Sequence, residues 1–182
     1  MSRIATPAID QTPAASRPLL DAVNKQLGVV PNLMKVLGNS AAALGGYLNL
    51  SGALGKGALG GQTGERIALA IAEFNRCGYC LAAHTYLGKN VARLDAAEIA
   101  ANRIGTSNDP KAAAAVRFAL IVAHQRGHVS DDAVRAVKGA GFSDGEVIEI
   151  VVHVALNTLT NYVNSVAQTQ IDFPEVELRR AA

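Results

Sequence analysis

Two cysteines and a histidine that lie close together are the residues of this chain best suited to chemistry. Cys77 and Cys80 are its only cysteines, and His84 follows one helical turn later. At about 100° per residue, a helix would carry all three side chains on one face. A Cys-x-x-Cys pair at a helix start can close a disulfide, and the backbone amides there stabilise a thiolate. A histidine one turn further on can accept a thiol proton near neutral pH.

A carboxylate from the preceding predicted helix would complete this group. Glu65 lies on that helix, and antiparallel packing of the two helices would bring its side chain to His84. A carboxylate in this position orients the imidazole, which gives a nucleophile, a base and an orienting group. Glu73, one turn before Cys77, is an alternative carboxylate, although a glutamate there is more often on the surface.

The two cysteines are not equivalent, and two arguments assign their roles differently. The amides at a helix N-terminus favour Cys77 as the more acidic thiol, because it comes first. The one-turn spacing to His84 favours Cys80 instead. We follow the spacing and expect Cys80 to be the activated thiol.

The residue types alone leave other interpretations open. Cysteine is often simply buried, so the pair could pack beside a core histidine. The same residues could also form a Cys₂His or Cys₂HisGlu zinc site, although structural zinc usually takes its ligands from two separated pairs. The alternative from another functional class is therefore a non-enzymatic metal-binding or redox-sensing helical protein that uses Cys77, Cys80 and His84.

Other polar patterns carry weaker functional signals. His124 and His128 are one turn apart near a helix end, where cations commonly complement the helix dipole. The glycine-rich stretch 55–61 lacks the Lys-Ser/Thr ending of a phosphate loop, so we expect a hinge or linker. A polar stripe along an apolar helix predicts a solvated or subunit-facing face, with the entrance of the active site as the alternative. Its members recur every four residues: His153, Asn157, Asn161 and Ser165.

The elements that would position these residues are all predicted to be helical. Thr63 is a plausible N-cap for the helix that carries Glu65, and two capping boxes, at 95–98 and 143–146, predict later helix starts. Alternating strand patterns, hairpin dipeptides and internal repeats are missing, so the predicted fold class is all-α. We expect helices over about 16–28, 31–37, from 40 into 55–61, 63–74, 80–88, from 95, from 110, over 131–138 and over 143–168.

Composition limits both the architecture and the classes of partner. The chain has 182 residues, of which 49% are hydrophobic and 18% charged, with a net charge of +2. This length fits one domain, expected over residues 18–182, with a flexible N-terminal arm over 1–17. A charged fraction below the usual ~25% suggests that sister subunits cover part of the surface.

The same composition excludes several partner classes. No Lys/Arg cluster and few aromatic residues argue against nucleic-acid binding. No apolar run is long enough to span a bilayer, and the N-terminus has no apolar signal region. We therefore expect a cytoplasmic protein, in which paired cysteines are more often catalytic or metal-binding than structural.

Together the candidate residues form the pattern Glu-(11 residues)-Cys-x-x-Cys-x-x-x-His, with Glu65 first and His84 last. This pattern resembles the alkylhydroperoxidase D-like branch of the carboxymuconolactone decarboxylase family. The stretch Gly-Val-Val-Pro-Asn-Leu at 28–33 and the segment 161–174 resemble its peroxidase-related subgroup. The resemblance covers about residues 27–174, and the Cys–His segment is its most specific part.

The resemblance implies an all-helical homo-trimer or homo-hexamer that reduces hydroperoxides through a redox-active cysteine pair. It implies that an external dithiol or reductase restores the pair. The sequence itself implies no cofactor, and this interpretation includes no metal. Carried over by position, Cys80 resembles the peroxidatic cysteine, Cys77 the resolving cysteine, His84 the base and Glu65 the group that polarises it. Tyr79 stands where the best-known members have a histidine. The decarboxylase branch lacks the cysteine pair, which makes decarboxylation the less expected activity.

Overall fold

A computed structural model describes residues 2–180, and every regular element in this range is helical, as predicted. Two short 3₁₀ turns, Ile9–Gln11 and Ala14–Ser16, precede the first α-helix. The α-helices are α1 (Arg17–Leu27), α2 (Asn32–Leu37), α3 (Ala41–Leu54), α4 (Gly61–Phe74), α5 (Gly78–Asn90), α6 (Ala96–Arg103), α7 (Pro110–His124), α8 (Asp131–Gly139) and α9 (Asp144–Ala167).

Helix starts follow the predicted caps in most places. The Asp95 side chain accepts the amide of Glu98, and Ser143 and Glu146 form a complete capping box at the start of α9. The predicted N-cap at Thr63 is wrong, because α4 begins two residues earlier, at Gly61. Gly60 precedes it with a φ of +79°, a conformation that glycine adopts without strain, and this turn starts the helix without a side-chain cap.

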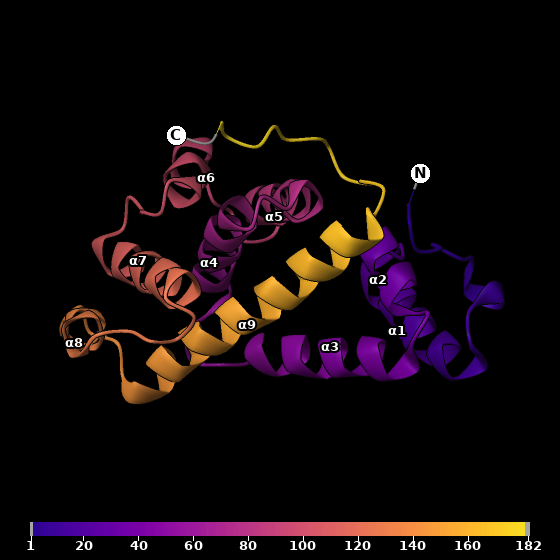
Figure 1. Ribbon diagram of the computed structural model, residues 1–182, viewed down its shortest axis with the longest axis horizontal. Helices are drawn as coiled ribbons and strands as arrows, with labels where there is room; N and C mark the ends of the chain where they lie inside the picture. Colours follow the sequence, from indigo (N-terminus) through magenta and orange to yellow (C-terminus); the bar gives the residue numbers. More distant parts are fainter. Residues whose placement is uncertain (1, 181–182) are drawn as a thin grey trace.

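Helix α4 lies at the centre of the arrangement and packs against α5, α6, α7 and α9. Its residues Ile67, Leu69 and Ile71 are completely buried. Figure 1 shows α9 crossing the molecule diagonally, with α3 on one side of it and α4 and α5 on the other. Helices α3, α4, α5 and α9 together line a cavity that has Glu65, Cys80 and His84 in its wall.

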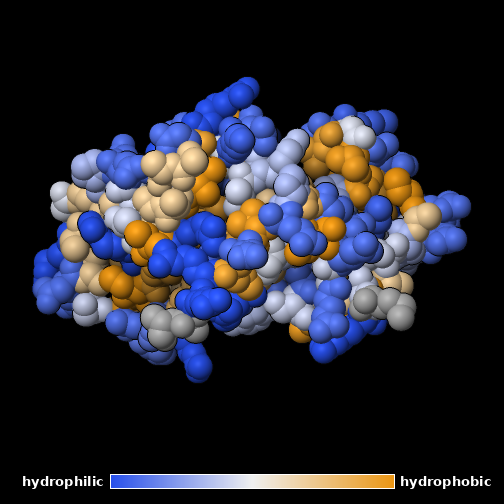
Figure 2. Space-filling view, turned by 90° about the horizontal axis from the view of Figure 1, so that it is seen from above, coloured by the Kyte–Doolittle hydropathy of each residue, from blue (hydrophilic) through white to orange (hydrophobic). Residues whose placement is uncertain are grey.

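After α9 the chain turns back and crosses the start of α5 as an extended segment. Its apolar side chains pack against the core cluster that contains Cys77 and Tyr79: Ile171, Phe173, Val176 and Leu178. Its end is held by Glu73, whose carboxylate accepts the amide of Arg179 at 2.7 Å. The face seen in Figure 2 mixes hydrophilic residues with several small hydrophobic patches.

The predicted arm over residues 1–17 follows the surface of the helical domain in the part that the structure describes. The Arg3 amide donates to the carbonyl of Ala167 at 2.7 Å, and the side chains of Thr12 and Ser16 are buried. The flexibility of this arm stays a prediction. Among the described residues, no helix is long and apolar enough to cross a membrane.

Candidate active site

The turn between α4 and α5 fixes the relative position of the two cysteines. Arg76 adopts a left-handed conformation, with a φ of +55°, and the extended Cys77 then starts α5 as its N-cap. In this position the Cys77 sulfur accepts the backbone amide of Cys80 at 3.2 Å. A sulfur thus takes the place that a serine or aspartate oxygen occupies in most N-caps. Both cysteines are free thiols and both are buried.

The surroundings of Cys80 favour its thiolate. The pKa of Cys80 is lowered to about 7, chiefly because the Cys77 thiol hydrogen-bonds to it. Burial opposes this shift, whereas the Asn164 amide, which donates to Cys80 Sγ at 3.2 Å, and the nearby His84 add to it. The pKa of Cys77 is raised, because its thiol proton is held in the hydrogen bond to Cys80 and is hard to remove. These contacts favour the thiolate of Cys80 over that of Cys77.

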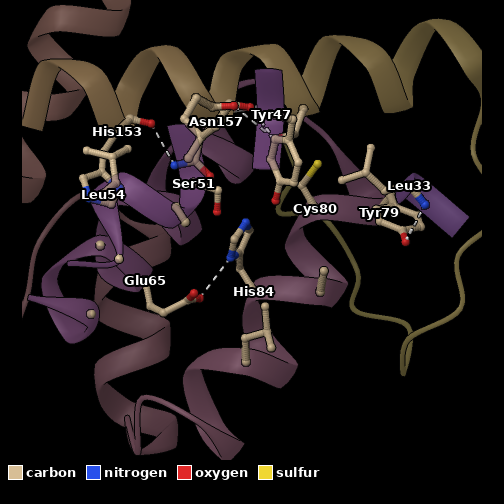
Figure 3. Close-up of a pocket in the computed structure, with 18 of the residues that line it drawn as sticks. Leu33, Tyr47, Ser51, Leu54, Glu65, Tyr79, Cys80, His84, His153 and Asn157 are labelled. Atoms are coloured by element: carbon tan, nitrogen blue, oxygen red, sulfur yellow. Dashed lines mark hydrogen bonds and ion pairs between the residues drawn. The ribbon is translucent and has the colours of Figure 1, made fainter. Parts of the chain in front are cut away.

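Glu65 lies beside His84, as antiparallel packing of the two helices predicts. The imidazole Nδ1 lies 2.9 Å from a carboxylate oxygen of Glu65, which joins the neighbouring helices α5 and α4. Burial alone would lower the pKa of His84, but the charge of Glu65 and its hydrogen bond outweigh this effect, so the pKa is raised. With Nδ1 facing Glu65, the other ring nitrogen points into the cavity (Figure 3). The imidazole is therefore placed to accept a proton from the cavity side.

The alternative carboxylate, Glu73, has a different role. One of its oxygens pairs with Arg103 of α6 at 2.7 Å, and the other accepts the Arg179 amide of the C-terminal segment. Glu65 and Glu73 are eight residues apart, which is about 12 Å along α4, so only Glu65 lies beside His84.

A cavity of about 240 Å³ lies between α3, α4, α5 and α9, and Cys80, His84 and Glu65 are all in its lining. Cys77 is not among the lining residues, so a small molecule in the cavity meets Cys80 first. Much of the wall is apolar, with contributions from Leu33, Leu54, Ala68, Ala83, Leu87 and Leu156. Polar side chains that the sequence did not single out also line it: Tyr47, Ser51 and Thr160.

The polar stripe on α9 faces inward, which corrects the predicted solvated or subunit-facing side. His153 and Asn157 line the cavity, and Asn161 is completely buried and accepts a hydrogen bond from Asn75 at 2.9 Å. Only Ser165 is exposed as predicted. The stripe had the correct period, but the sequence did not show that the polar face is the buried one.

Tyr79, which stands in the place of the family histidine, is part of the packing around the cysteines. Its hydroxyl accepts the amide of Leu33 at 3.1 Å, and its ring contacts Phe173 edge-on. Burial raises the pKa of this phenol, so it stays protonated at neutral pH. Tyr79 therefore links α5 to α2 and to the C-terminal segment.

The remaining candidates lie outside the site or support it. His124 stacks near Phe74 on the surface side of α7. Within the described range, no group of three or more His, Cys, Asp or Glu side chains is arranged to hold a metal ion. The glycine-rich stretch is a loop at the edge of the cavity, and Glu149 holds it by accepting the amides of Ala58 and Leu59 at 3.0 and 2.8 Å.

Comparison with known proteins finds a family that is similar to the segment carrying these residues. Residues 41–120 match the model of the carboxymuconolactone decarboxylase family. Over these residues the chain is similar to this family. The matched segment runs from α3 into α7, and it includes the four residues of the Glu–Cys–Cys–His pattern. The resemblance seen in the sequence is thereby confirmed. No match was found among curated proteins.

Solved structures show how the family fold is shared. The chain is 24% identical to a peroxidase-related protein with an alkylhydroperoxidase AhpD core from Ralstonia eutropha JMP134, with a TM-score of 0.83 and coverage of 94% of this chain and 92% of that one. A peroxidase-related protein from Silicibacter sp. TM1040 is 20% identical, with a TM-score of 0.79 and coverage of 92% and 89%. A cysteine-to-alanine variant of the debrominase Bmp8 in complex with 2,3,4-tribromopyrrole is 18% identical, with a TM-score of 0.72 and coverage of 87% and 86%.

Proposed function

We propose that the protein is a thiol-dependent hydroperoxide reductase, with Cys80 as the attacking thiol and Cys77 as the resolving thiol. The observation that carries this proposal is the position of Cys80. Its sulfur borders the cavity, its pKa is lowered to about 7, and a second thiol hydrogen-bonds to it. A thiolate that is populated near neutral pH, with a partner thiol in the same helical turn, suits two-electron reduction of a peroxide.

The proposed cycle has three steps. His84, oriented by Glu65, accepts the Cys80 proton, and the thiolate attacks the O–O bond to give a sulfenic acid and an alcohol or water. The Cys77 thiol then condenses with the sulfenic acid, which releases water and forms the disulfide. An external dithiol or reductase reduces the disulfide and restores both thiols. We include a cytoplasmic location in this proposal because such reductants keep thiols reduced there.

A turnover assay tests this proposal directly. Consumption of hydrogen peroxide and of cumene hydroperoxide is followed in the presence of a panel of dithiol donors. Sustained consumption that depends on the donor, and that is lost in Cys80→Ser, is expected. A protein that binds zinc tightly through its thiols and consumes no peroxide would instead favour the non-enzymatic metal-binding alternative, so the metal content is measured on the same sample.

Reductive dehalogenation is a second candidate, supported by the fold shared with the debrominase Bmp8 and by the largely apolar cavity beside Cys80. A thiolate that attacks bromine would take it from the aromatic ring, the ring carbon would gain a proton, and Cys77 would then displace bromide to form the same disulfide. Release of bromide from 2,3,4-tribromopyrrole in the presence of a dithiol would distinguish this activity from peroxide reduction.

The expected homo-oligomer is also part of the proposal, and the outer face of α9 supports it. Ile148, Val151, Ala155, Leu159 and Tyr162 follow one another at helical spacing, and all five are exposed. In an antiparallel pair of α9 helices centred on Ala155, Ile148 would face Tyr162 of the second copy, and Val151 would face Leu159. The smallest residue then lies at the closest approach, as helix packing favours.

The charges of α9 suit the same arrangement. Its acidic side chains, Asp144, Glu146 and Glu149, lie in the first two turns, and the helix has no Lys or Arg, so an antiparallel pair keeps the two acidic ends far apart. A two-fold contact of this kind produces an even number of subunits. Of the two assemblies expected from the sequence, the hexamer contains such a contact and the trimer does not.

A further inference from the structure

Tyr47 is one of the polar residues that line the cavity and to which the proposed relay assigns no role. It lies on α3, across the cavity from α4 and α5, and is packed against the cluster that contains Cys80. In Figure 3 its hydroxyl points into the cavity, beside Cys80 and toward the free nitrogen of His84. A peroxide whose outer oxygen meets Cys80 would therefore have this hydroxyl within its immediate surroundings.

The environment of Tyr47 keeps its phenol protonated. Burial raises the pKa of Tyr47, and the negative charges of Glu65 and of the Cys80 thiolate raise it further, while a hydrogen bond with Ser51, one turn along α3, acts in the opposite direction. The phenol is thus a neutral hydrogen-bond donor in a space where Cys80 is a thiolate. His84, the cationic group on this side of the cavity once it has taken the Cys80 proton, is placed to return a proton to it.

Tyr79, the other tyrosine that lines the cavity, does not direct its hydroxyl toward His84. The hydroxyl of Tyr79 accepts the Leu33 amide and lies toward α2, away from His84. Among the described residues that line the cavity, Tyr47 is therefore the phenol that faces both the thiol and the imidazole.

We propose that Tyr47 is a catalytic residue that donates the proton to the departing oxygen when the Cys80 thiolate cleaves the peroxide. This inference rests on the proposed function. As the sulfur–oxygen bond forms and the O–O bond breaks, the electron pair of that bond moves to the leaving oxygen, which takes the phenol proton and departs as an alcohol. The imidazolium of His84 then gives its proton to the phenolate, so the proton first removed from Cys80 ends on the product.

The leaving group provides the test, because the need for an acid depends on it. An alkoxide is a strong base and must be protonated as it leaves, whereas the carboxylate released from a peroxyacid is a weak base and leaves without help. Iodide, released when iodoacetamide alkylates the thiolate, needs no proton at all. The three reagents use the same Cys80 thiolate and differ in the step assigned to Tyr47.

Rates of oxidation by cumene hydroperoxide and peracetic acid, and of alkylation by iodoacetamide, are measured on the reduced full chain and on Tyr47→Phe. The expected result is a loss of roughly ten- to a hundredfold with cumene hydroperoxide, with little change for the other two reagents. Tyr86→Phe, at a tyrosine of α5 that is 45% exposed and does not line the cavity, is the matched control and should match the wild type in all three reactions.

Equal losses with all three reagents would assign Tyr47 a structural role, and an unchanged rate with cumene hydroperoxide would also overturn the inference. If cumene hydroperoxide does not oxidise the wild type while iodoacetamide still alkylates Cys80, the proposed function is wrong. The inference about Tyr47, which rests on that function, is then wrong as well. Should Tyr47→Phe not fold, Ser51→Ala removes only the hydroxyl bonded to the phenol. It should then show a smaller loss with the same dependence on the leaving group, and an equal effect on all three reagents would count against the proposal.

Discussion

The sulfur of Cys77 caps the helix that carries Cys80, accepting the Cys80 amide at 3.2 Å. This contact places both sulfurs in one helical turn and puts Cys77 behind Cys80 as seen from the cavity. This arrangement suits two different roles, in which the Cys80 thiol reacts with the substrate and the Cys77 thiol then forms the disulfide.

The first prediction concerns these two roles. In Cys77→Ser, one equivalent of peroxide should leave Cys80 as a sulfenic acid, because the resolving thiol is missing. In Cys80→Ser, the remaining thiol is buried outside the cavity lining and should react slowly. Mass spectrometry after labelling with a sulfenic-acid probe checks both variants. A sulfenic acid that accumulates on Cys77 in the second variant would reverse the assignment.

The second prediction concerns the relay. Glu65→Gln keeps the shape of the side chain but removes its charge, which should slow alkylation of Cys80 roughly ten- to a hundredfold, about 1.4–2.8 kcal/mol. His84→Ala should cost at least as much, and the double variant little more than His84→Ala alone, because members of one relay are not additive.

Glu73→Gln is the matched control for the relay, because Glu73 pairs with Arg103 and not with His84. Its alkylation rate should stay near that of the wild type. Fully additive losses in the double variant, or a larger loss in Glu73→Gln than in Glu65→Gln, would show that Glu65 does not act through His84.

The third prediction is a pH profile. Because the pKa of Cys80 is lowered to about 7, alkylation should be fast above this pH and fall as the pH drops through it and the thiolate becomes protonated. Asn164→Ala removes a hydrogen bond to the sulfur that favours the thiolate, so the midpoint should move to higher pH and the rate at neutral pH should decrease. An identical midpoint in both proteins would mean that Asn164 does not stabilise the thiolate.

The fourth prediction concerns assembly. Leu159→Glu places a charge in the middle of the exposed apolar face of α9 and should halve the mass of the assembly in solution, because it separates the two-fold pairs. Val91→Glu, at a valine that is 70% exposed elsewhere, is the matched control and should leave the mass unchanged. Light scattering measures both. A wild-type trimer, or an unchanged mass in Leu159→Glu, would contradict the two-fold contact.

The helical fold and the core of the site could be predicted because local signals determine them. Capping boxes at Asp95 and Ser143 locate helix starts, and the helical period places Cys77, Cys80 and His84 together. The choice between Glu65 and Glu73 needed one further fact, namely that α4 and α5 pack side by side. That fact concerns tertiary structure, and the sequence supports it only through the family pattern.

The sequence could not predict which side chains surround Cys80 and His84 in the cavity. The inward direction of the α9 stripe depends on the way α9 crosses α3, α4 and α5, which no local pattern determines. Tyr47 and Ser51 are one turn apart on α3, but this spacing has no functional meaning until the cavity beside them is known. The start of α4 was misplaced because a glycine turn at Gly60, rather than the side chain of Thr63, begins the helix.

The proposed chemistry is tested most directly by a single turnover. Fully reduced protein is mixed with one equivalent of cumene hydroperoxide, and the alcohol product and the protein mass are measured together. We predict one equivalent of alcohol and the loss of two hydrogens from the protein, with a disulfide between Cys77 and Cys80 in the peptide map. Intact peroxide with both thiols still reduced, or alcohol formed equally by Cys80→Ser, would contradict the proposal.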